Sequence, residues 1–190
     1  MPFANPYPLI FEDRTANPLN TDFDEVYERM YFHVSRVPGT MKTRLYEMNH
    51  RASRDRLPPQ RVLIELEFRP DESLGTITFV WPPRPPNPRV IPMSQYLRKM
   101  SFFGPSTTRK FIAGDGREYR WGHRVVAGQE WSCTSADDIL VAHYDLKPPD
   151  VRTYGITSGN NLTIYQSFSY LSSEIIASFL IMRQILQYRL

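Results

Sequence analysis

The stretch SYLSSEIIASFLIMRQILQYRL, residues 169–190, decides the fold of this chain. Between residues 168 and 188 its apolar side chains recur three and four positions apart, which is the spacing of an α-helix. Further isoleucines and leucines fill most of the remaining circumference. Because a helix that is apolar nearly all round must be enclosed, this segment is predicted to be buried in either lipid or protein.

A membrane anchor does not suit this segment. A spanning helix needs about 20 consecutive apolar residues, whereas the dense apolar run here extends only from Ile175 to Met182. Glu174 and Arg183 bracket that run, and burying both charges in hydrocarbon would cost roughly 5 kcal/mol or more. The sequence therefore predicts no transmembrane segment and a helix that is enclosed by protein.

Most of the preceding chain alternates apolar and polar residues, which is typical of half-buried strands. The run RVLIELEFR, residues 61–69, and the run GTITFVW, residues 75–81, predict one hairpin. Gly114-Asp115-Gly116 predicts a second hairpin with a tight turn and positive φ angles. Further strands are expected at residues 7–11, 31–37, 40–48, 109–113, 117–121, 130–134, 139–145 and 161–165.

Together these elements predict a mainly β fold, a closed or nearly closed antiparallel β-barrel of about 12 strands that encloses a hydrophobic C-terminal helix. A barrel of about 8 strands is filled by its own side chains, whereas one of about 11 or 12 leaves room that a helix must fill. A chain of 190 residues is long enough for one core and too short for two ordinary domains. We therefore expect a single domain, residues 1–190, with its central helix at residues 168–188.

The proline-rich segment WPPRPPNPRVIP, residues 81–92, interrupts the strand pattern. Its prolines lack the N–H donor that a sheet needs, so a loop excursion is expected. PxxP spacings of this kind are bound by SH3-like and WW-like domains, and the candidate docking residues are Pro82, Pro83, Arg84, Pro85 and Pro86. The following MSQYLRKM, residues 93–100, predicts either one or two helical turns or an irregular edge, which leaves the strand register between residues 81 and 108 open.

Positive charge is concentrated in the middle of the chain. The formal net charge is +3, but residues 84–124 hold nine Lys and Arg against two Asp and Glu. Such a patch either attracts an anionic partner or is a solvated surface without one. The candidate anion-binding face consists of Arg98, Lys99, Arg109, Lys110, Arg117, Arg120 and Arg124. Nucleic acid is disfavoured as the partner, because exposed aromatics do not alternate with these charges and no recognised motif is present.

The sequence contains no catalytic or metal-binding motif. Its four histidines, at positions 33, 50, 123 and 143, lack the spacing of zinc ligands. Cys133 shares one side of a predicted strand with Trp131, which favours a buried structural thiol over a nucleophile. A single cysteine and the absence of an apolar leader indicate a reducing, cytoplasmic setting. We expect a non-enzymatic domain with no cofactor and no metal.

The segments RKFIAGDGREYRW (109–121), EWSCT, ILVAHYD and NLTIYQSFSYLSSEIIASFLIM resemble the tubby C-terminal-like superfamily. That group contains the tubby domain, the phospholipid scramblases and the LURP-one-related proteins, and the chain most resembles an uncharacterised fungal family from mushroom-forming species. The resemblance is best over residues 109–190, and the proline-rich segment departs from the pattern. It implies a β-barrel threaded by a hydrophobic helix and, in the tubby branch, phosphoinositide binding through basic surface residues, but no residue motif carries over.

The expected function is therefore that of a binding or adaptor domain, cytoplasmic and peripheral at membranes, whose basic middle region contacts an anionic lipid head group or another anion. The alternative is a protein-interaction scaffold that displays WPPRPPNP. A third possibility, a hydrophobic ligand or acyl chain held inside the barrel, conflicts with a helix that already occupies that space.

Overall fold

The computed structural model describes residues 7–51, 61–69, 74–81, 89–100, 107–153, 155 and 157–190. The helical segments are α1 (Met93–Tyr96), the 3₁₀-helix η1 (Gln166–Leu171) and α2 (Ser172–Tyr188). The strands are β1 (Leu9–Asp13), β2 (Asn20–Glu25), β3 (Tyr31–Arg36), β4 (Lys42–Met48), β5 (Arg61–Phe68), β6 (Gly75–Phe79), β7 (Arg89–Pro92), β8 (Arg98–Lys99), β9 (Thr108–Ile112), β10 (Glu118–His123), β11 (Trp131–Ser135), β12 (Leu140–Asp145) and β13 (Asn160–Ile164).

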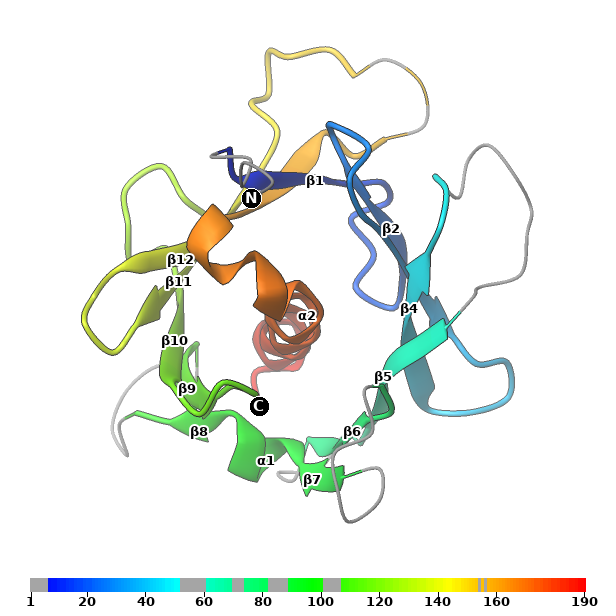
Figure 1. Ribbon diagram of the computed structural model, residues 1–190, viewed down its shortest axis with the longest axis vertical. Coiled ribbons are helices and arrows are strands. Elements are labelled where there is room, and N and C mark those ends of the chain that lie inside the picture. The colour runs from blue at the N-terminus through cyan, green and yellow to red at the C-terminus, as the bar shows by residue number, and fades with distance from the viewer. Residues whose placement is uncertain are drawn as a thin grey trace, which may run out of the picture.

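The 13 strands of the described chain form one antiparallel sheet that curls around α2 (Figure 1). Their order is β7-β6-β5-β4-β3-β2-β1-β13-β12-β11-β10-β9-β8. The edge strands β7 and β8 are not hydrogen-bonded to each other, so the sheet is not closed by hydrogen bonds. The predicted mainly β fold with a C-terminal helix is confirmed. Of the predicted closed or nearly closed barrel, the structure shows a curled sheet whose ends are not joined by main-chain hydrogen bonds.

Helix α1 lies between the two edge strands and explains why they do not pair (Figure 1). Its residues Met93 and Tyr96 are buried, as is Leu97 directly after it. The Tyr96 ring lies 5.7 Å from the ring of Phe79 on β6 and 5.5 Å from the ring of Phe111 on β9, measured between centroids. The two ends of the sheet therefore meet through side chains rather than through main-chain hydrogen bonds.

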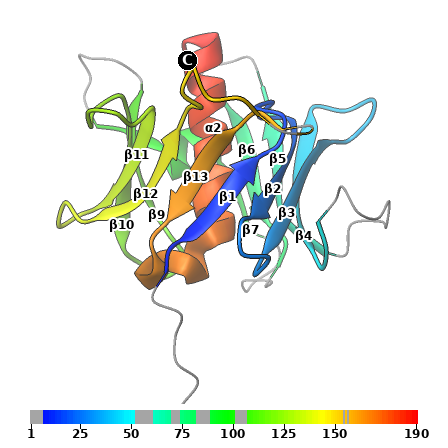
Figure 2. The same cartoon turned by 90° about the horizontal axis from the view of Figure 1, so that it is seen from above.

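Helix α2 runs through the interior of the curled sheet (Figure 2). Every side chain from Ile175 to Met182 is buried, as expected for a helix that is apolar nearly all round. The α-helix begins at Ser172, later than the predicted residue 168, because a 3₁₀-helix occupies the preceding turn. No helix among the described residues has the length and apolar content that crossing a membrane requires.

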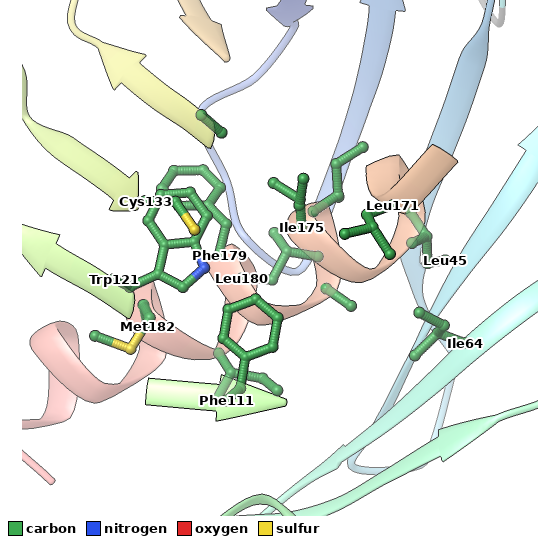
Figure 3. Packing of buried hydrophobic residues seen from close by; sticks show 14 of the residues in the cluster. Leu45, Ile64, Phe111, Trp121, Cys133, Leu171, Ile175, Phe179, Leu180 and Met182 are labelled. Atoms are coloured by element: carbon green, nitrogen blue, oxygen red, sulfur yellow. The ribbon is translucent and has the colours of Figure 1, made fainter. Parts of the chain in front are cut away.

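Aromatic side chains of β10, β11 and β12 pack against Phe179 of α2, which lies near Trp121 in Figure 3. The ring centroid of Phe179 is 5.4 Å from that of Trp121, 6.2 Å from that of Trp131 and 4.6 Å from that of Tyr144. The indole nitrogen of Trp121 donates a 2.8 Å hydrogen bond to the hydroxyl of Ser178. The small Ser178 side chain thus allows close approach of the sheet and satisfies the buried indole N–H.

All ten strands expected from alternation are present, with ends that differ from the predicted ones by at most two residues. Strand β2 escaped prediction because three carboxylates obscure its pattern in NTDFDE. One of them, Glu25, is fully buried and accepts hydrogen bonds from the main-chain N–H groups of Tyr27 and Arg29. These bonds and the 2.6 Å ion pair with the Arg29 side chain stabilise the ionised carboxylate inside the fold.

The end of the proline-rich segment is a strand, which corrects the expected loop. Residues Arg89–Pro92 form β7 and pair with β6, with Pro92 opposite Thr76. A proline is tolerated here because β7 is an edge strand that has no further neighbour to donate to. Residues 82–88 lie outside the described chain, as do residues 70–73 between the two strands of the first predicted hairpin.

The predicted hairpin at Gly114-Asp115-Gly116 is confirmed between β9 and β10. Of its residues, only Gly116 has a positive φ angle, of 80°, so Asp115 does not adopt the expected conformation. The main-chain N–H of Gly114 donates to the Glu174 carboxylate at 2.9 Å, which attaches the hairpin to the first turn of α2. One of the two charges that bracket the apolar run is thus satisfied by the protein.

Candidate functional site

Three of the sequence-predicted cations lie in a row across β8, β9 and β10. In the antiparallel register Arg98 is opposite Lys110, and Lys110 is opposite Arg120. Residues that are opposite each other project from the same face of a sheet, with Cβ atoms about 5 Å apart. Lys110 and Arg120 keep 34% and 28% of their side-chain surface exposed, and Arg98 is exposed. We call Arg98, Lys110 and Arg120 the basic row.

Carboxylates neutralise part of this row. The Nζ atom of Lys110 is 3.0 Å from Oε2 of Glu118, and Arg120 is paired with Asp138, whose own side chain is largely exposed. Arg98 forms no ion pair with any acidic residue that the structure describes. Exposed ion pairs contribute only about 0–1 kcal/mol, so an anion could displace these carboxylates at small cost.

Arg109 does not belong to the basic row, which corrects the sequence-based grouping. It is buried, opposite Trp121 and Lys99 in register, and therefore projects from the inner face. Its guanidinium donates to the main-chain oxygens of Leu97 at 3.3 Å and Leu190 at 3.0 Å. Burial lowers its pKa below the ordinary arginine value. Arg109 thus joins the sheet to the end of the chain, and Lys99 faces away from the row.

Arg117 and Arg124 flank β10 at opposite ends. Seven residues of extended chain span roughly 23 Å, so these two side chains cannot contact one small anion together. Arg124 donates to Glu130 through Nε at 2.8 Å and through a terminal nitrogen at 3.1 Å. These bonds raise the pKa of Arg124 above its ordinary value. Of the seven predicted cations, three therefore form the basic row, and the other four lie apart from it.

The predicted docking residues Pro82, Pro83, Arg84, Pro85 and Pro86 lie outside the described residues. Trp81, which precedes them, is described and is about half exposed. The guanidinium of Arg61 lies over its ring, 4.8 Å from the centroid. This cation–π contact holds Trp81 against Arg61 at the start of β5.

The described residues contain no group of three or more His, Cys, Asp and Glu side chains placed to hold a metal ion. Cys133 is fully buried, as its strand position predicted, and burial raises the pKa of its thiol far above the ordinary value. A thiol that stays protonated is a poor nucleophile. His33, His123 and His143 each lie beside a carboxylate, of Asp22, Glu130 and Asp145 respectively.

An apolar cavity of about 150 Å³ lies beside the C-terminal half of α2. Its lining residues come from α2, from the ends of β3, β4 and β5, and from the chain next to β2 and β6: Leu19, Arg36, Met41, Thr43, Phe68, Arg69, Leu74, Ile181, Gln184, Ile185, Tyr188 and Leu190. Sequence analysis missed this cavity because its walls come from segments far apart in the chain. The cavity opens to the surface at this end of the helix, where the lining residues Met41 and Tyr188 are exposed.

Comparison with curated proteins found no match, and comparison with solved structures found none either. Residues 16–187 match a protein family, and this match extends from before β2 to the last turn of α2. Because the matched region covers most of the chain, the assignment applies to the sheet and the helix together. The chain belongs to DUF6593, a family of unknown function.

Proposed function

We propose that this protein is a non-enzymatic, tubby-like binding domain that recognises an anionic lipid head group, of the phosphoinositide type, through the basic row. The observation that carries this proposal is the register of Arg98, Lys110 and Arg120 on three adjacent strands. The resemblance of residues 109–190 to the tubby-like superfamily supports the same ligand class. The protein would then act on the cytoplasmic surface of a membrane, as a peripheral component.

The spacing of the row suits a ligand with several phosphates. Adjacent strands lie about 4.8 Å apart, so three cations on three strands extend over roughly 10 Å. Arg98 and Arg120 at the two ends supply planar guanidinium groups, which bind phosphate through two parallel hydrogen bonds. Lys110 supplies a point charge between them, and a head group with phosphates on adjacent ring positions could contact all three.

The charge balance of the row predicts weak binding that depends strongly on salt. Glu118 and Asp138 offset two of the three cations. Each basic residue near an anionic membrane contributes about 1 kcal/mol, and this attraction falls off within a Debye length of about 10 Å at 0.1 M salt. Removing a competing carboxylate should therefore strengthen binding, which a surface without a partner would not show.

Sedimentation with liposomes tests the proposal. The vesicles would contain phosphatidylcholine with or without a phosphoinositide, at low and at physiological salt. Binding should require the phosphoinositide, fall at least tenfold in R98Q/K110Q, and rise in E118Q. The matched control is K42Q/R44Q, which removes two cations of β4 that both form ion pairs with Glu65 of β5. Equal binding by R98Q/K110Q and by the control, or no head-group dependence at low salt, would contradict the proposal.

A further inference from the structure

The cavity beside α2 contains two buried polar side chains that lack a partner. Thr43 is 1% exposed and Gln184 is 5% exposed, and both line the cavity. Neither Oγ1 of Thr43 nor Nε2 of Gln184 has a hydrogen-bond partner among the described residues. An unsatisfied buried polar group costs about 1–3 kcal/mol. A ligand in this cavity would satisfy both atoms.

Nε2 of Gln184 can only donate hydrogen bonds, so it requires an acceptor on the ligand, and the hydroxyl of Thr43 can donate to the same acceptor. A threonine hydroxyl donates one hydrogen bond, and a glutamine amide nitrogen donates two and accepts none. Apart from Arg36 and Arg69, the cavity wall is mainly apolar, with Ile181 and Ile185 of α2 fully buried and Leu74 nearly so. The ligand that fits this chemistry has an apolar body and one end that carries accepting oxygens.

Positive charge at the cavity indicates that this accepting end is anionic. Arg36 is directly opposite Thr43 in the pairing of β3 with β4, so both side chains project from the inner face. The guanidinium of Arg36 donates to the main-chain oxygen of Thr40 at 3.1 Å and contacts Sδ of Met41. No described carboxylate is paired with it. Arg69, the second arginine in the lining, lies 3.8 Å from Glu67, which is a weak pair.

We propose that this cavity binds a medium-chain fatty acid. The carboxylate accepts hydrogen bonds from Thr43 and Gln184 and lies close to Arg36, and the hydrocarbon chain packs against Ile181, Ile185 and Leu74. An apolar cavity of about 150 Å³ accommodates a molecule of roughly six carbon atoms. The chain length that fits is therefore about six to eight carbons. This site is separate from the basic row, which lies on the outer face.

Calorimetric titration of the full chain with sodium octanoate, below its micelle concentration, tests the inference. Octanoate should bind saturably with one-to-one stoichiometry. T43V and Q184M keep the side-chain size but remove the donors, and each should weaken binding about tenfold. R36Q should weaken binding at low salt and reduce its salt dependence. R152Q, which removes an exposed arginine elsewhere, should bind as the unaltered protein does.

The stability of T43V without ligand is a second measurement, and it should change in the opposite direction to the affinity for octanoate. Because T43V removes an unsatisfied buried hydroxyl, it should unfold at a higher urea concentration than the unaltered protein while it binds octanoate more weakly. Absence of saturable octanoate binding would overturn the inference. Equal octanoate affinity in T43V, Q184M and the unaltered protein would overturn it too, and 1-octanol binding as tightly as octanoate would exclude recognition of the carboxylate.

Discussion

The guanidinium of Arg183 on α2 donates a 3.1 Å hydrogen bond to the carboxylate of Asp13 on β1 inside the curled sheet. Asp13 is fully buried and also accepts hydrogen bonds from the hydroxyls of Thr21 at 2.6 Å and Tyr144 at 2.7 Å. The residue that follows the apolar run of the helix is therefore paired within the protein. Together with the bond from Gly114 to Glu174, this pair accounts for both charges that flank the run.

We expect loss of Arg183 to destabilise the fold, because it leaves Asp13 buried without its cationic partner. R183M should lower the free energy of unfolding by about 3 kcal/mol. A double-mutant cycle with D13N, measured by urea denaturation, should give a coupling energy of about 1–3 kcal/mol. Strictly additive effects of R183M and D13N would show that the two side chains do not interact.

Two glycines with positive φ angles should respond differently to alanine. A Cβ atom on Gly75, whose φ is 97°, would lie 1.8 Å from the main-chain oxygen of Glu67, whereas a Cβ atom on Gly39, whose φ is 73°, would meet nothing within 4 Å. G39A should therefore lower the free energy of unfolding by about 1 kcal/mol, through backbone strain alone. G75A should lower it considerably more, because the Cβ atom also overlaps the main chain. Denaturation midpoints of the two variants measure the difference, and equal losses would contradict the close approach of β5 and β6.

Asp24 should make stability depend on pH between about 4 and 6. Burial and the nearby charge of Asp22 raise the pKa of Asp24 from 3.8 to about 6, and Arg51 and Arg14 offset only part of that rise. The folded state thus binds the proton of Asp24 more tightly than the unfolded state does. The protonated carboxyl therefore adds to the free energy of unfolding below pH 4, and this stabilisation is lost as the pH rises to about 6. The free energy of unfolding of D24N, measured by urea denaturation relative to that of the unaltered protein, should therefore rise by about 2 kcal/mol between pH 4 and pH 7.

The control for this pH effect is D150N, which alters an exposed carboxylate. Its stability relative to the unaltered protein should stay constant over the same range. If D24N showed the same flat profile, the raised pKa of Asp24 would be refuted.

The helix is expected to be indispensable to the fold. A chain that ends at Ser167 should be insoluble, because the inner face of the sheet would be exposed without α2. L180D places a charge at a fully buried position and should have the same effect, whereas Y188D alters a side chain that is 57% exposed and should be tolerated. The solubility of the expressed proteins checks this prediction, and a folded, soluble truncation would contradict it.

Local pattern was sufficient to predict most of the fold. Alternation identified ten strands, and the apolar spacing of residues 168–188 identified α2, because burial on one face or all round is visible within a few residues. Strand β2 was hidden by Glu25, whose burial depends on the Arg29 side chain. The unpaired edges of the sheet could not be predicted, because they depend on how Tyr96 contacts Phe79 and Phe111, which are distant in sequence.

The candidate sites were predictable only in part, for the same reason. The local excess of basic residues indicated the region of the basic row, but the count could not show that Arg109 points inward while Lys110 points outward. Successive side chains of a strand point to opposite faces of the sheet, so a shift of one residue in the register exchanges inward and outward positions. The cavity gave no sequence signal at all, because Thr43 and Gln184 are brought together only by the packing of α2 against β4.

Hydrogen–deuterium exchange of the purified protein in detergent-free buffer tests most directly that α2 is the core of the domain. Residues 175–185 of α2 should exchange among the slowest in the chain, at a rate similar to that of the central strands β1 and β13, because opening them requires global unfolding. Fast exchange across these residues while β1 and β13 remain protected would contradict the account, since the helix would then lie outside the sheet that positions both proposed sites.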